Sequence, residues 1–205
     1  MVGIIDYSVG NLGSIKNMVK YVGGEAKIVE KPDDFIDCDR VILPGVGAFD
    51  KGIKSLRNSG LLEKLEYLTL EKKMPTLGIC LGAQLMTLNS SEGVENGLGW
   101  LNAETVKFNL NSTEYKLPHM GWNEIKTIGK HPIFDGLDNE SRFYFVHSYF
   151  MQSNDTQQIL ARTKFGIEFD SGLCDKNIVA LQFHPEKSHK FGMKVISNFL
   201  NWNPK

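Results

Sequence analysis

The stretch Gly78-Ile79-Cys80-Leu81-Gly82 follows an apolar run that begins with Met74-Pro75. That run predicts a buried strand, and the residues after Gly82 predict the start of a helix. A cysteine between the two, with glycine two positions before and after it, has the spacing of the strained G-x-S-x-G turn that exposes a nucleophile. Backbone N–H groups at a helix N-terminus would favour the thiolate. The stretch therefore predicts Cys80 as a nucleophile; the alternative is a buried structural cysteine.

Composition limits the class of protein. The 205 residues are 41% hydrophobic and 23% charged, and the net charge of −1 favours neither a nucleic-acid nor an anionic-membrane partner. Three widely spaced cysteines fit a reducing compartment, and no spacing of cysteines or histidines indicates a metal site. Without a signal-peptide pattern or an apolar run near the roughly 20 residues of a membrane span, we expect one cytoplasmic domain over 1–205.

Strand and helix patterns alternate through the first half of the chain. We expect strands at 2–5, 26–29, 41–43 and 76–79, with helices near 12–22 and 55–72. This order predicts an α/β protein with an open, mostly parallel central sheet and flanking helices. The second half predicts added antiparallel strands at 105–108, 115–117, 124–126, 143–146, 159–161, 166–169 and 178–181, then a last helix from about 189 to 202.

A base for Cys80 is predicted at the end of another strand. His184 follows an apolar segment, and in open α/β sheets the carboxyl ends of strands form the ligand-binding edge. Pro185 stiffens the turn, and Glu186 can fold back to hold the imidazole tautomer. The tripeptide is a weak signal by itself. Together with the turn at Cys80, more than a hundred residues upstream, it predicts a Cys-His-Glu triad.

Two segments carry a resemblance to a known family. The residues from Gly78 to Gln84, together with Gln182-Phe183-His184-Pro185-Glu186-Lys187-Ser188, resemble the class I, triad-type glutamine amidotransferases. The segments 43–49, 118–123 and 144–149 resemble one branch, the glutaminase subunits of imidazole glycerol phosphate synthase. The resemblance covers nearly the whole chain and implies a flavodoxin-like fold without a cofactor or metal.

The resemblance also implies a mechanism. Cys80 would attack the carboxamide of glutamine and release ammonia, while His184 moves the proton and Glu186 orients His184. Developing negative charge on oxygen needs donors aimed at it. The donors implied are the backbone N–H of Leu81 and one from Val46 or Gly47. The glutamine-binding set implied by the family is Gln84, Glu92, Ser148 and Tyr149, with Glu92 either contacting the α-ammonium group or remaining a solvated charge.

Ammonia must then reach an acceptor. The resemblance implies a heterodimer with a HisF-type barrel subunit, which uses ammonia in histidine biosynthesis. The positions matching the docking face or gate of this branch are Asn11, Tyr144, His147 and Lys187. Asn11 could equally be a helix cap, Tyr144 a core residue and Lys187 a surface charge.

Two departures from the family leave other functions open. Ala83 stands where methionine is common, and 87–90 lacks the usual acidic or aromatic residues. One alternative is a paralogue that supplies ammonia for acetamidino sugars of surface glycans. Another is an inactive regulatory or scaffold subunit, against which the complete triad argues.

Overall fold

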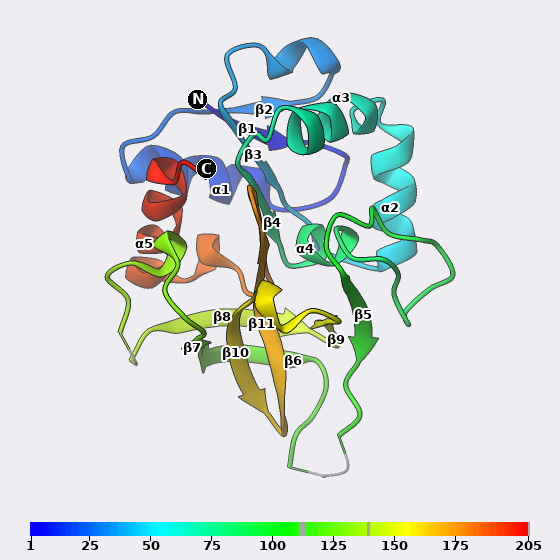
Figure 1. Ribbon diagram of the computed structural model, residues 1–205, viewed down its shortest axis with the longest axis vertical. Coiled ribbons are helices and arrows are strands. Elements are labelled where there is room, and N and C mark those ends of the chain that lie inside the picture. Colours follow the sequence, from blue (N-terminus) through cyan, green and yellow to red (C-terminus); the bar gives the residue numbers. More distant parts are fainter. Residues whose placement is uncertain (111–113, 139, 205) are drawn as a thin grey trace.

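A large mixed sheet with helices on both faces forms the centre of the molecule (Figure 1). The computed structural model describes residues 1–110, 114–138 and 140–204. Five neighbouring parallel strands form one half of the sheet, in the order β2 (Ala26–Val29), β1 (Val2–Ile5), β3 (Arg40–Leu43), β4 (Thr76–Ile79) and β12 (Ile178–Leu181). Every residue of β1, β3, β4 and β12 is buried, because helices cover both faces.

The rest of the sheet is antiparallel. Beyond β12 lie β11 (Ile167–Asp175), β10 (Ile159–Phe165) and β7 (Lys126–Thr127), while β9 (Tyr149–Ser153) pairs with both β11 and β5 (Ala103–Lys107). A separate antiparallel ribbon consists of β6 (His119–Glu124) and β8 (Arg142–His147). The predicted α/β fold, with a parallel first half and antiparallel strands in the second, is therefore confirmed.

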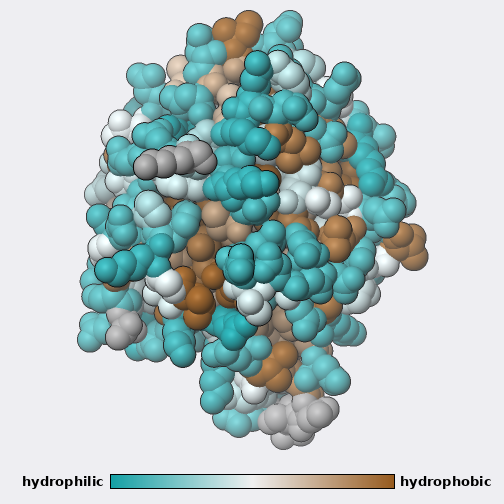
Figure 2. All heavy atoms as spheres, in the orientation of Figure 1, coloured by the Kyte–Doolittle hydropathy of each residue, from teal (hydrophilic) through white to brown (hydrophobic). Residues whose placement is uncertain are grey.

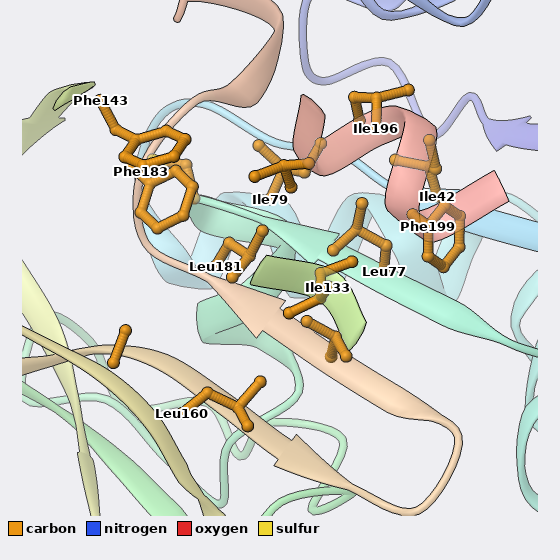
Figure 3. Packing of buried hydrophobic residues seen from close by; sticks show 14 of the residues in the cluster. Ile42, Leu77, Ile79, Ile133, Phe143, Leu160, Leu181, Phe183, Ile196 and Phe199 are labelled. Atoms are coloured by element: carbon orange, nitrogen blue, oxygen red, sulfur yellow. The ribbon is translucent and has the colours of Figure 1, made fainter. Parts of the chain in front are cut away.

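The helices divide between two hydrophobic clusters. On one face α1 (Leu12–Tyr21) packs near α5 (His189–Asn201); on the other α2 (Phe49–Asn58) packs near α4 (Leu81–Leu85). Neighbouring strand residues alternate between these clusters, so Ile42 contacts the first and Leu43 the second. Figure 3 shows Ile42 and Leu77 beside Phe199 of α5.

Three elements predicted from the sequence were wrong in extent or existence. The helix expected over 55–72 is split into α2, α3 (Leu62–Glu66) and a π-helical segment (Tyr67–Glu71), with Gly60 at φ +75° between α2 and α3. No strand forms at 115–117, because the chain bends there before Pro118. The strand expected at 124–126 is divided, since β6 ends at Glu124 and β7 begins at Lys126.

Short 3₁₀ turns connect several of the elements. They span Pro32–Phe35, Pro132–Phe134, Thr156–Gln158 and Pro185–Lys187. Hydrophilic side chains cover most of the face drawn in Figure 2, and brown hydrophobic areas interrupt them. Among the residues described, no helix is both long and apolar enough to span a bilayer.

Candidate active site

The turn between β4 and α4 places Cys80 at φ +52°, a backbone conformation that side-chain-bearing residues rarely adopt. Its backbone N–H donates to the Leu181 carbonyl at 2.8 Å. A Cβ on Gly82 would lie 1.9 Å from the Leu43 carbonyl oxygen, and one on Gly78 would lie 2.8 Å from Ala83 Cα. Side chains at either position would therefore clash, and both flanking glycines are needed for steric reasons.

Replacing Gly82 with alanine should destabilise the protein by roughly 3 kcal/mol, because the new methyl group meets backbone that cannot move aside. For a chain of this size we expect the midpoint of thermal unfolding to fall by about 6–12 °C. Gly13→Ala is the control: it lies within α1 with no atom near the added Cβ and should change stability by at most about 1 kcal/mol. Equal midpoints for the two variants would contradict the steric argument.

His184 reaches Cys80 because β12 and β4 are neighbours, with Leu181 paired to Ile79. The imidazole Nδ1 lies 2.7 Å from Glu186 Oε1, and the two side chains are 1% and 3% exposed. Within the described residues, the buried Nε2 atom forms no hydrogen bond of standard geometry. Burial lowers the pKa of His184, but the adjacent negative charges of Cys80 and Glu186 outweigh it and raise that pKa to about 10. The site therefore favours an imidazolium beside the cysteine sulfur.

Two polar residues that the sequence analysis left without a role complete this arrangement. Ser188 Oγ donates to the His184 carbonyl at 2.6 Å and accepts the Tyr144 N–H at 3.0 Å, which ties the turn to β8. Gln182 is fully buried, and its Nε2 lies 3.9 Å from Cys80 Sγ. A glutamine inside an otherwise apolar strand segment was the available signal, because buried polar groups need partners.

A cavity of about 310 Å³ opens beside Cys80. Its lining residues are Val46, Gly47, Cys80, Leu81, Gln84, Glu92, Pro118, Val146, His147, Ser148 and Tyr149. The structure thus brings every predicted oxyanion and glutamine-binding residue to one pocket. No group of three or more metal-ligating side chains occurs in the described ranges.

Two of the predicted glutamine-binding side chains are themselves held in place. Gln84 Nε2 donates to the Tyr149 carbonyl at 2.9 Å. Glu92 Oε2 accepts the N–H of Phe49, the first residue of α2, at 2.8 Å. Half-buried Glu92 is therefore not a free solvated charge.

The loop predicted to supply an oxyanion donor is bonded to the turn at Cys80. The Leu81 N–H donates to the Gly45 carbonyl at 3.3 Å, so this predicted donor is occupied. Tyr7 Oη donates to the Pro44 carbonyl at 2.5 Å, and burial raises the pKa of the Tyr7 hydroxyl, which keeps its proton. A Cβ on Gly45 would lie 2.6 Å from that hydroxyl oxygen. Pro44 and Gly45 are thus buried and closely packed, and the Leu81 N–H of the predicted oxyanion hole is not free to bind substrate in this arrangement.

The residues predicted for a partner face or gate differ in their exposure to solvent. Asn11 is exposed and caps α1 by accepting the Ser14 N–H at 3.2 Å. Lys187 is exposed, with Nζ 5.5 Å from the centre of the Tyr144 ring. His147 differs, because it is 6% exposed and lines the pocket.

Comparisons with known proteins identify the family of this chain. The model of the family "Glutamine amidotransferase class-I" (GATase) matches residues 3–202. The chain belongs to the class I glutamine amidotransferase family. It is 46% identical over 200 residues to imidazole glycerol phosphate synthase subunit HisH 2 of Pseudomonas aeruginosa, and 49% identical over 200 residues to HisH 2 of Methanococcus maripaludis. Each alignment covers 98% of both chains.

Within the glutamine amidotransferase family, these identities place the chain in the HisH group. A crystal structure of a glutamine amidotransferase is similar in fold, with a TM-score of 0.76 over 98% of this chain and 97% of that one. Its sequence is only 21% identical, so the likeness concerns the fold alone.

Proposed function

We propose that this amidotransferase is the glutaminase subunit of an imidazole glycerol phosphate synthase, which hydrolyses glutamine and passes ammonia to a HisF-type barrel subunit in histidine biosynthesis. The observation that carries the proposal is the meeting of Cys80 with the His184–Glu186 pair beside one pocket. The similarity to curated HisH subunits supports the choice of acceptor pathway.

The chemistry follows from the hydrogen bond between His184 and Glu186. The carboxylate accepts Nδ1–H and leaves Nε2 to take the thiol proton of Cys80. The sulfur then bonds to the amide carbon of glutamine, the C–N bond breaks, and the imidazolium returns the proton to the leaving amine. Water attacks the resulting thioester, giving glutamate and restoring the thiol.

Stabilising the oxyanion requires Leu81 to lose its present acceptor. Its N–H can serve the substrate oxygen only after the Gly45 carbonyl turns away. Gly47, at φ +112° with no atom within 4 Å of an added Cβ, gives this loop a permissive backbone. We therefore expect low activity until a bound ligand or partner reorients the loop.

Exposed apolar side chains on the β6–β8 ribbon support the proposal of a partner subunit. Met120 and Trp122 of β6 are 62% and 47% exposed. The Trp122 ring lies 6.2 Å from that of Tyr144, over which Lys187 is placed. Exposed apolar groups gathered in this way are typical of docking surfaces.

The two departures from the family that suggested an acetamidino sugar as acceptor lie outside the pocket. Ala83 belongs to α4, is buried in the hydrophobic cluster that α2 and α4 share, and does not line the pocket. The Thr87 hydroxyl donates to the Gln84 carbonyl at 2.7 Å and is buried. Neither Ala83 nor any residue of 87–90 lines the pocket, so these departures leave the pocket lining unchanged.

The test is glutamate release by this chain alone, with a HisF-type barrel, and with the barrel plus its nucleotide ligand. We expect a weak rate alone and a rise of roughly tenfold or more with the liganded barrel, which lies within the usual range of coupling between sites. If the barrel has no effect while a glutamine-like electrophile still labels Cys80, the chain is a glutaminase for another acceptor. If the barrel has no effect and the electrophile does not label Cys80, the proposed activity is contradicted.

A further inference from the structure

Two histidines behind the pocket form a buried pair that the reaction steps above do not use. His119, the first residue of β6, is paired in register with His147, the last residue of β8. Their side chains are 3% and 6% exposed, and His119 Nδ1 lies 2.9 Å from His147 Nε2. His119 does not line the pocket, whereas His147 does. The pair thus connects the ribbon to the pocket wall.

The Tyr149 carbonyl, which His147 contacts, fixes the direction of every hydrogen bond in this pair. His147 Nδ1 lies 2.8 Å from the Tyr149 carbonyl, which can only accept, so Nδ1 carries the hydrogen. A neutral imidazole has one N–H, and Nε2 of His147 must therefore accept from Nδ1 of His119. Nε2 of His119 then accepts from the Asn123 amide at 3.1 Å. Both rings are Nδ1–H tautomers, and both use all their polar atoms.

Both rings are held neutral. A proton added to His147 Nε2 would face the N–H of His119, and one added to His119 Nε2 would face the N–H of the Asn123 amide, so two donors would meet without an acceptor. Burial lowers the pKa of His119 to about 4. Burial is also the main cause that lowers the pKa of His147 to about 3, and the charges that His119 and His184 would carry lower it further. His119 is also stacked between Phe145 and Phe165, with ring centres 4.8 Å and 4.1 Å away.

The chain of hydrogen bonds continues into the glutamine-binding residues. The Tyr149 carbonyl that accepts from His147 also accepts from Gln84 Nε2, and the same Nε2 lies 3.1 Å from Gln182 Oε1. Gln182 in turn lies beside Cys80 Sγ. A shift of the Tyr149 carbonyl would therefore displace Gln84 in the pocket wall.

We propose that His119 is a positioning residue for glutamine binding: through His147 it holds the Tyr149 carbonyl, and through that carbonyl it holds the Gln84 side chain. This inference rests on the proposed glutaminase function. Loss of the His119 donor leaves Nε2 of His147 buried and unpaired, which costs free energy. Rotation of the His147 ring or a change of its tautomer then becomes favourable. Tyr149 and Gln84 then lose their fixed positions.

Two variants separate this role from simple packing. His119→Phe keeps an aromatic ring between Phe145 and Phe165 but removes the donor. His119→Asn places an amide N–H where Nδ1 stood and restores the donor. With the barrel partner bound, we expect KM for glutamine to rise about tenfold in His119→Phe, the cost of one unpaired buried group, with a smaller change in kcat. His119→Asn should stay within about threefold of the wild type.

A purely structural role predicts a different result, namely a lower unfolding midpoint in His119→Phe with KM unchanged, and that result would overturn the proposal. Nitrogen-15 NMR of the histidine-labelled wild-type chain tests the pair without relying on activity. Both rings should remain neutral Nδ1–H tautomers down to about pH 5, and an Nε2–H tautomer at His147 would also overturn the proposal. If the wild type releases no glutamate but shows these tautomers, the proposed function fails and the hydrogen-bonded pair stands.

Discussion

Cys80→Ala is expected to abolish glutamine-dependent synthesis by the complex of this chain with its barrel partner, while synthesis from added ammonia continues. The sulfur is the only atom of the proposed triad that bonds to substrate, and removing a nucleophile commonly costs about 10⁴-fold or more. The two rates should be measured on the same preparation, with glutamine or an ammonium salt as the nitrogen source.

The matched control is Cys174→Ala. Its sulfur lies 3.6 Å from His131 Nε2, and Cys174 is not among the pocket residues. Burial raises the pKa of the Cys174 thiol to about 12, so it remains protonated and unreactive. This variant should retain the wild-type rate with either nitrogen source. Glutamine-dependent turnover that survives in Cys80→Ala would show that the nucleophile assignment is wrong.

Glu186→Gln should lower kcat for glutamine hydrolysis by roughly 10²–10⁴-fold without abolishing it. The variant keeps the shape of the side chain but loses the charge that orients and stabilises the imidazolium, and removing the orienting acid of other triads has effects near the upper end of this range. Because Glu186 is 3% exposed, solvent screens its charge weakly. The measurement is kcat with saturating glutamine and the barrel partner present.

The same variant should also change the pH profile. The negative charge of Glu186 contributes to raising the pKa of His184 to about 10, so its loss must lower that pKa. The imidazolium that protonates the leaving amine will then disappear at a lower pH, and the alkaline limb of the kcat profile should move toward acid. Glu168→Gln, at the exposed carboxylate that pairs with Arg162, is the control and should leave the profile unchanged. An unmoved alkaline limb in Glu186→Gln would contradict the assigned role.

Much of the local structure around the site was predictable because its causes are local. The apolar run before Gly78 could only be buried, and glycines on both sides of Cys80 indicate a turn that side chains would obstruct. Glu186 is two residues from His184, within reach across one stiff turn, and the structure places them 2.7 Å apart. The alternation of strands and helices likewise predicted that β1 to β4 run parallel to one another.

Only the tertiary structure decided which distant groups share a hydrogen bond. Cys80 meets His184 because β4 and β12 became neighbours in the sheet. The Leu81 N–H was implied as an oxyanion donor, and only the tertiary structure shows that it donates to the Gly45 carbonyl of another loop. His119 and His147 determine each other's tautomer only because β6 and β8 pair in that register. A sequence motif specifies which donors and acceptors a segment carries, but the packing of the elements decides how each buried one is satisfied.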